Sequence, residues 1–293
     1  MSSDSIVICG QQFSDKVLQQ IQNLINQDKT MTRAELARQV CDLIGWYRVT
    51  GQRKDMSCRV ALLKLQRKGL LSLPPATKVI TGNRAIDHSI SLPEIAITKS
   101  VEQIDGLSLV LVSHKHGSTL WKIMIQRYHY LGYTPLVGAQ LRYVIGWDQG
   151  YLGAIGFSAS AWRVAPRDQF IGWSGNARRA NLPYVIGNSR FLILPWVHSK
   201  NLASKILSLS AKRVVVDWNQ VYGYRPILVE TYVEQQRFLG SCYRAANWIN
   251  VGQTQGRGKL DRNHERAVPV KDIYLYPLRP DFRALLCREG GLS

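Results

Sequence analysis

Apolar residues recur at helical spacing through the start of the chain, in three stretches separated by polar residues. The spacing predicts helices over residues 13–30, 32–46 and 55–71. Thr32 and Glu35 form a capping box, which marks the start of the second of these helices. The apolar stripes expected to face a core are Val17, Ile21, Leu24 and Ile25; Leu36, Val40, Leu43 and Ile44; and Val60, Leu63 and Leu65.

The third predicted helix is basic and leads into an extended segment, LLSLPP. Three short helices followed by a strand are typical of helix-turn-helix and winged-helix domains. We therefore expect residues 1–85 to form a small, helical, winged-helix-like domain, with a linker over residues 86–106. A helical cap with a solvated basic face explains the same pattern. In the winged-helix interpretation, the cations that face nucleic acid are Arg53, Lys54, Arg59, Lys64, Arg67 and Lys68.

From residue 107 onward, apolar runs of strand length alternate with helical patterns. Residues 141–147 and 151–158 are separated by DQG, which predicts a hairpin. Further strands are predicted over 107–113, 189–195, 225–233 and 272–278, with helices over 118–132, 201–213 and 241–248. This order predicts an α/β (α+β) domain with a mixed sheet over residues 107–293.

The net charge indicates what kind of partner the protein binds. Thirty-eight lysines and arginines stand against 20 acids, giving +18 at pH 7. A positive field of this size attracts polyanions, so we expect nucleic acid, and DNA first, as a partner. The five cysteines form no CxxC pair, so neither a disulfide framework nor a structural zinc site is predicted. No apolar run is long enough to span a membrane, and we expect a cytoplasmic protein without a membrane partner.

One strand breaks at Pro195 and is followed by a helix that starts near NLASKIL. The first turn of a helix has free backbone N–H groups, which form a ready anion site. This turn resembles the acyl-CoA-binding turn of the GNAT acyltransferase superfamily, in which Ala203 fits the pattern and Asn201 stands where the family has glycine. The resemblance implies an acyl-CoA cofactor held by Leu194, Val197, His198, Ser199, Lys200, Asn201, Leu202, Ala203 and Ser204.

A second segment, GSCYRAANWINVG, resembles the GNAT pattern Tyr-x3-Gly-Phe-x3-Gly. The resemblance implies that Tyr243 protonates the departing thiolate of CoA, with Glu230 or Asp168 as the base. A packed aromatic side chain explains Tyr243 equally well. Two central strands splayed over an open cleft would favour an enzyme, whereas a cleft plugged by Trp196 or Trp248 would favour a binding module.

Taken whole, the chain is similar to the DruA-like proteins of the Druantia anti-phage defence system, relatives of which lie beside transposases. The segments that carry this resemblance are YHYLGY, AWRVAPRDQFIGWS, NSRFLILPWV, NLASKIL, ILVETYV and CYRAANWINVGQTQGRGK. The resemblance extends over nearly the whole chain. It implies a role in phage defence or mobile-element biology, with other defence-system or transposon-encoded proteins as partners.

Two rival functions remain open on the residues alone. Asp168, Asp217 and Glu230 stand at or near strand ends, where carboxylates can hold Mg²⁺, so a metal-dependent nuclease or transposase-like enzyme is one alternative. A non-enzymatic DNA-binding subunit with a degenerate GNAT fold is the other. Basic residues interleaved with aromatic residues or glycines suit nucleic acid in either case: Arg167, Arg178, Arg179, Arg257, Lys259 and Arg262. The histidines predict no metal site.

Overall fold

The computed structural model describes residues 5–28, 30–49, 51–75, 92–256 and 268–292. The chain divides into two compact units, an N-terminal unit over Met1–Arg84 and a C-terminal unit over Ala85–Ser293. Each unit has its own hydrophobic core. Within the described residues, no helix combines the length and the apolar composition needed to cross a membrane.

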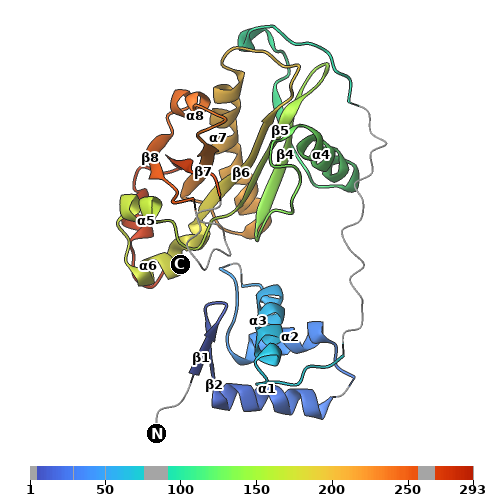
Figure 1. Cartoon of the computed structure of the whole chain (residues 1–293), viewed down its shortest axis with the longest axis vertical. Coiled ribbons are helices and arrows are strands. Elements are labelled where there is room, and N and C mark those ends of the chain that lie inside the picture. The colour runs from blue at the N-terminus through green and yellow to red at the C-terminus, as the bar shows by residue number, and fades with distance from the viewer. Residues whose placement is uncertain (1–4, 29, 50, 76–91, 257–267, 293) are drawn as a thin grey trace. The chain divides into compact units, whose positions relative to one another are not determined.

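The N-terminal unit packs three helices and a short hairpin around one core (Figure 1). Its elements are β1 (Ser5–Ile8), β2 (Gln11–Ser14), α1 (Asp15–Gln27), α2 (Arg33–Leu43) and α3 (Asp55–Arg67). The predicted cap of α2 is confirmed, because the Thr32 hydroxyl accepts a hydrogen bond from the Glu35 amide. The hairpin was not predicted. It turns on Cys9 and Gly10, both of which have positive φ, as a two-residue hairpin turn requires.

Two details of the N-terminal prediction were wrong. Val60 and Leu43 are exposed, because the apolar faces of α2 and α3 that reach the core are centred on neighbouring positions such as Ala37 and Leu62. The segment LLSLPP has no strand among its described residues, and the hairpin of this unit precedes α1 instead of following α3. The winged-helix interpretation therefore stays a prediction.

The C-terminal unit is a mixed α/β domain built on one sheet, as the alternation of strands and helices predicted. Its strands are β3 (Ser108–Leu111), β4 (Gln140–Trp147), β5 (Gly150–Ala159), β6 (Val185–Ile193), β7 (Leu228–Glu234), β8 (Ile249–Gln253) and β9 (Lys271–Pro277). Its helices are η1 (Val101–Gln103), α4 (Lys115–Tyr128), α5 (Ala165–Ile171), α6 (Gly175–Asn181), η2 (Leu182–Tyr184), α7 (Leu202–Tyr222), α8 (Ser241–Ala245) and α9 (Phe282–Leu286).

The seven strands lie in the order β3-β4-β5-β6-β7-β9-β8. All neighbours are antiparallel except β6 and β7, which are parallel and are joined by α7. Parallel neighbours need such a crossover helix, whereas the β4–β5 pair closes through the predicted hairpin. This hairpin, strand–helix–strand order is the one that the resemblance to GNAT enzymes implies.

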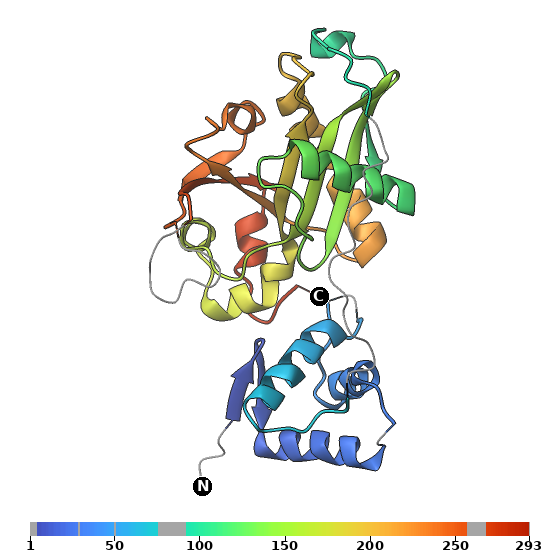
Figure 2. The same ribbon diagram turned by 45° about the vertical axis from the view of Figure 1, so that its right-hand side comes forward.

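Helices cover both faces of the sheet (Figures 1 and 2). Adjacent residues of β4 show this, since side chains alternate along a strand. Arg142 donates to Ser118 on α4, whereas Tyr143 donates to Asp217 on α7. The cores on both faces are apolar and aromatic, with Trp121 of α4 and Trp218 of α7 fully buried.

The described part of the segment predicted as a linker is folded. Residues 92–106 belong to the C-terminal unit, because Leu92, Ile97 and Ile104 are buried in its core. The backbone of Ile97 is also bonded to the turn after β6: its amide donates to the Trp196 carbonyl and its carbonyl accepts from the His198 amide.

Candidate functional site

The site is built around an irregularity in the central strand β6. The register of β5 against β6 shifts between Gly156 and Phe157, which oppose Arg190 and Asn188. Ser189 is therefore an extra residue, a β-bulge, and bulges bend a strand and redirect its side chains. The side-chain nitrogen Nδ2 of Asn188 stabilises this bend by donating to the backbone carbonyl oxygens of Gly156 and Arg190.

Beyond the bulge, β6 leaves β7. The two strands pair only at Val185–Gly187 against Leu228–Glu230. From Asn188 and Thr231 onward no backbone pair joins them, and the described contact is a side-chain one, from the Thr231 hydroxyl to the Asn188 carbonyl at 3.0 Å. The edge of β6 that faces away from β5 therefore presents backbone groups that need other partners.

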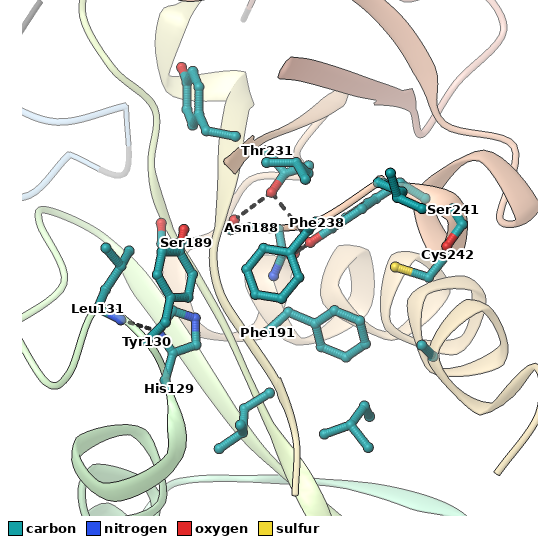
Figure 3. Close-up of a pocket in the computed structure, with 18 of the residues that line it drawn as sticks. His129, Tyr130, Leu131, Asn188, Ser189, Phe191, Thr231, Phe238, Ser241 and Cys242 are labelled. Atoms are coloured by element: carbon teal, nitrogen blue, oxygen red, sulfur yellow. Dashed lines mark hydrogen bonds between the residues drawn. The ribbon is translucent and has the colours of Figure 1, made fainter. Parts of the chain in front are cut away.

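A cavity of about 420 Å³ occupies this opening, and we call it the cleft. It extends from the face of α7 and α8 to the end of α4, so it passes between the splayed strands. In Figure 3, Tyr130 and Leu131 lie on one side of β6 and Ser241 and Cys242 on the other. Its lining includes apolar, aromatic and hydroxyl side chains, as is usual for small-molecule sites. The lining residues are Tyr128, His129, Tyr130, Leu131, Asn188, Ser189, Phe191, Leu192, Ile193, Ala203, Thr231, Tyr232, Val233, Phe238, Leu239, Gly240, Ser241, Cys242 and Tyr243.

Tyr243 is the predicted catalytic residue that the structure brings into the cleft. Its hydroxyl donates to the Asn188 side-chain oxygen at 3.0 Å and lies 3.5 Å from the Thr231 hydroxyl. Burial raises the pKa of Tyr243, so its hydroxyl keeps its proton at neutral pH. Trp248 packs edge-on against Tyr243. Neither Trp248 nor Trp196 lines the cleft, so neither plugs it.

The turn before α7 supplies the other predicted residues. Asn201 has φ 64° and ψ 0°, the left-handed conformation that favours glycine and that asparagine tolerates best among other residues. Asn201 stands where the GNAT pattern has glycine, and it adopts a backbone conformation that glycine also adopts. The first α-helical hydrogen bond runs from the Lys205 amide to the Asn201 carbonyl, which leaves the amides of Ala203 and Ser204 without a helical partner.

The remaining predicted cofactor residues divide by exposure. The hydroxyl oxygen of Ser199 is buried and has no partner among the described residues. Ala203 lines the cleft. Leu194, Val197 and Leu202 are buried in the core, and the Leu202 amide donates to the Ser199 carbonyl. The side chains of His198 and Lys200 are exposed, and Ser204 donates its hydroxyl to the Asn201 carbonyl.

His129 and Tyr130, at the end of α4, complete the cleft. Burial, followed by the nearby charges of Arg190 and Lys271, lowers the pKa of His129 to about 4. The ring is therefore neutral at pH 7. Its Nδ1 accepts a hydrogen bond from the Leu131 amide, so the proton lies on Nε2. His129 can thus donate a hydrogen bond at this wall of the cleft.

The predicted bases Glu230 and Asp168 lie outside the cleft, in a buried ion network. Arg167 is fully buried and binds the Glu230 carboxylate at 2.9 Å and the Asp168 carboxylate at 2.7 Å. Glu230 also accepts from the hydroxyls of Ser160 and Tyr232. All of these bonds satisfy a buried charge, which is a structural role. The expectation that either carboxylate acts as the base is therefore corrected.

The three carboxylates proposed for a metal do not converge. Asp168 and Glu230 meet over Arg167, whereas Asp217 accepts from Tyr143 and Arg213 in a separate network on α7. Among the described residues, no group of three or more His, Cys, Asp or Glu side chains can hold a metal ion. The nuclease alternative thus loses the arrangement that it requires.

The cations predicted to contact nucleic acid are in different situations. Because Arg167 is fully buried, its prediction as a phosphate contact is wrong. Arg53, Arg59 and Arg178 each pair with a carboxylate, and Lys54 is half-buried. Lys64, Arg67, Lys68 and Arg179 are exposed. Arg257, Lys259 and Arg262 lie outside the described residues.

Sequence reasoning missed the residues that shape the opening, above all Asn188 and Ser189. Their signal is the polar run Asn188–Arg190 inside an otherwise apolar strand, VIGNSRFLI. A polar interruption of a central strand is a reason to expect a bulge, because a buried polar side chain needs a partner.

The family model described as Druantia protein DruA matches residues 65–267, more than half of the chain. The match begins near the end of α3, so most of the N-terminal unit lies outside it, and it is narrower than the expected resemblance over nearly the whole chain. No curated protein matches the chain.

Several solved structures are similar in fold. One is a probable acetyltransferase of the GNAT family from Chromobacterium violaceum, with 14% identity over 71% of this chain and 96% of that chain and a TM-score of 0.36. Another is the aminoglycoside acetyltransferase AAC(6')-Ib in complex with coenzyme A, with 11% identity over 58% and 95% of the chains and a TM-score of 0.39. The same enzyme with coenzyme A and kanamycin has 10% identity over 58% and 95% of the chains and a TM-score of 0.37.

Proposed function

Since the chain belongs to the family of Druantia protein DruA, we propose that it is a group transferase that uses an acyl-CoA donor and acts on nucleic acid in anti-phage defence or mobile-element biology. The observation that carries the proposal is the separation of β6 from β7 after three parallel pairs, with the Tyr243 hydroxyl facing the space that opens. A strand pair that opens in the middle of a sheet leaves backbone groups unsatisfied, and a bound extended ligand satisfies them.

The residues around the opening fit an acyl-CoA. The amides of Ala203 and Ser204 at the start of α7 would hold its phosphates, together with the unpartnered hydroxyl of Ser199. The free edge of β6 beyond the bulge would bind its extended amide-containing arm. When bound, an acyl-CoA supplies a thioester whose acyl group can pass to a nucleophile.

Tyr243 would act on the sulfur side of that chemistry. Its hydroxyl is protonated and is held in place by Asn188. The pKa of Tyr243 is raised and lies above that of an ordinary thiol. Complete transfer of the tyrosine proton to a thiolate is therefore unfavourable in free energy. We therefore infer that Tyr243 stabilises negative charge on sulfur by donating a hydrogen bond.

Nucleic acid is the acceptor that the charge of the chain supports. The net charge of +18 favours a polyanion, and exposed cations stand in both units. Each cation that neutralises a phosphate releases counterions, so such binding should weaken steeply with added salt.

The experiment measures release of free thiol from acetyl-CoA by the full chain, with single-stranded or duplex DNA as acceptor. We expect release that depends on DNA. In Tyr243→Phe we expect the rate to fall roughly 10- to 100-fold while the affinity for acetyl-CoA changes by less than about twofold.

Tyr184→Phe is the matched control. The Tyr184 hydroxyl donates to the Leu292 carbonyl in a different core cluster, and its loss should leave the rate unchanged. A chain that binds DNA tightly but neither binds acetyl-CoA nor releases thiol would contradict the proposal. That result would leave the DNA-binding subunit as the function.

A further inference from the structure

A second cavity, of about 320 Å³, adjoins the cleft, and we call it the side pocket. It shares Asn188, Ser189, Leu131 and Tyr232 with the cleft, so the two cavities meet at the bulge. Its other lining residues, which include the described ends of the segment between β8 and β9, are Arg190, Thr254, Gly256, Val268, Pro269 and Lys271.

The side pocket opens on the face of the sheet opposite to Tyr243. Side chains alternate along β7, so Thr231 and Tyr232 point to opposite faces. Thr231 contacts the Tyr243 hydroxyl, whereas Tyr232 donates to Glu230, the partner of Arg167. A donor held at the start of α7 would thus enter the cleft from one face of the sheet. The side pocket reaches the bulge on the other face.

Arg190 is the distinctive group in the side pocket. One guanidinium nitrogen donates to the Ser189 carbonyl and another to the Thr134 hydroxyl, at 2.7 Å and 2.6 Å. Its Nε is buried and has no partner among the described residues. Burial lowers the pKa of Arg190. Among the described residues, Arg190 forms no ion pair with a carboxylate. A half-buried arginine that no acid of the described residues neutralises is costly unless an anion binds there.

Lys271 adds a second positive charge. In the β7–β9 pair it opposes Glu234, and Asp272 follows it on the same strand, where side chains alternate between faces. The Glu234 carboxylate is bound by Arg237 at 2.9 Å and is buried. Arg190 and Lys271 both lower the pKa of His129, so their fields overlap near the junction with the cleft. The side pocket is therefore a positive subsite beside the reacting position.

We propose that the side pocket binds a phosphate group of the acceptor, a phosphodiester of a polynucleotide, through Arg190 and Lys271. Arginine pairs with phosphate through several N–H groups, and lysine contributes a point charge. A phosphate fixed there places the attached nucleotide at the bulge, next to the cleft. The inference rests on the proposed function, since it names the acceptor of the same site.

The test measures two affinities of the full chain, one for a short single-stranded DNA oligonucleotide at several salt concentrations and one for acetyl-CoA. The variants are Arg190→Gln and Lys271→Gln. Their controls, Arg225→Gln and Lys212→Gln, remove the same charge from exposed positions outside both cavities. An oligonucleotide with a neutral methylphosphonate backbone is the control ligand.

We expect Arg190→Gln to weaken DNA binding about tenfold and to reduce the slope of log K against log salt by about 0.7, the value for one phosphate contact on a single strand. Lys271→Gln should show the same slope change with a smaller loss. Both controls should change DNA affinity less than about twofold, and no variant should change acetyl-CoA affinity. The neutral oligonucleotide should not distinguish Arg190→Gln from the wild type.

Two results would overturn the inference. In the first, both variants bind DNA as their controls do. In the second, the variants lose acetyl-CoA affinity and keep DNA affinity, which would assign the side pocket to the phosphates of the donor. If the wild type binds no acetyl-CoA, the proposed function fails, and the DNA measurements still decide whether this pocket binds phosphate. Lys271→Gln decides the matter if Arg190→Gln does not fold.

Discussion

The two ends of the β6–β7 pair differ in their backbone pairing and in the polar groups that they hold. At the paired end, Val185–Gly187 meet Leu228–Glu230 in a regular parallel ladder. At the open end, Asn188–Ile193 and Thr231–Val233 diverge around the cleft. The paired end holds an ion network around the fully buried Arg167, whereas the described lining of the open end contains hydroxyl, amide, thiol and imidazole groups and no carboxylate.

The difference teaches which polar groups are available for chemistry. A carboxylate held by several donors in the core has its charge already compensated, so it stabilises the fold and is a poor base. His129 at the open end has unused capacity, since its Nε2 carries a proton, and Ser199 in the turn before α7 has an oxygen without a partner among the described residues. The catalytic base was expected among the acids, whereas the described residues that line the cleft include no acid.

The largest effect is expected at the paired end. Glu230→Gln leaves the buried Arg167 charge with only Asp168 to compensate it, so the free energy of unfolding should fall by about 3 kcal/mol or more. Urea unfolding of the full chain measures this loss.

A double variant, Arg167→Gln with Glu230→Gln, tests the reason. Because the two residues share one ion pair, the double variant should lose clearly less than the sum of the single losses. A stable Glu230→Gln protein that cannot release thiol from acetyl-CoA would restore Glu230 as a catalytic group and break the distinction between the two ends.

The next largest effect is expected at the turn that leads from the open end into α7. Asn201→Val forces a β-branched residue into a left-handed conformation, which should cost about 1–2 kcal/mol of stability and weaken acetyl-CoA binding. Asn201→Gly is the control, and it should keep both properties. Equal behaviour of the two variants would show that the conformation of this turn does not matter for the donor.

The smallest effect concerns His129. Its pKa of about 4 in the folded chain lies below the ordinary value of 6.5, so the unfolded chain takes up a proton first as the pH falls. Stability should therefore be complete above about pH 6.5 and decline toward pH 4, by about 1 kcal/mol at pH 5 once partial exposure is allowed for.

His129→Gln should remove this pH dependence, and His116→Gln, an exposed histidine on the same helix, should leave it in place. The measurement is urea unfolding near pH 7 and near pH 5. An NMR titration of the wild type that places the pKa of His129 near 6.5 would contradict the electrostatic account of the open end.

Local signals in the sequence predicted much of the fold. Thr32 caps α2, the DQG turn closes the β4–β5 hairpin, and Pro195 ends the strand before α7. These signals succeed because a cap or a tight turn depends on neighbouring residues. The position of β9 between β7 and β8 could not be predicted in this way, since it is set by pairing between distant segments.

The site was predicted less completely, and Arg167 shows why. An arginine among aromatic residues is typical of a nucleic-acid contact. Arg167 is instead buried, and it is paired with Asp168 on its own helix and with Glu230, which is distant in the sequence. Tyr243 was found through a motif, because its position on α8 follows a recognisable local pattern. Arg190 was not predicted. It lines the side pocket next to the bulge at Ser189, which was not predicted from the sequence either.

The central claim is that the open end of the β6–β7 pair receives the donor. Hydrogen exchange of the full chain with and without acetyl-CoA tests it most directly, because amides that gain a ligand partner exchange more slowly. The account predicts slower exchange over Ser189–Ile193 and at Ala203 and Ser204, with no change at Val185–Gly187. Saturating acetyl-CoA that protects none of these amides, or protects only the N-terminal unit, would contradict it.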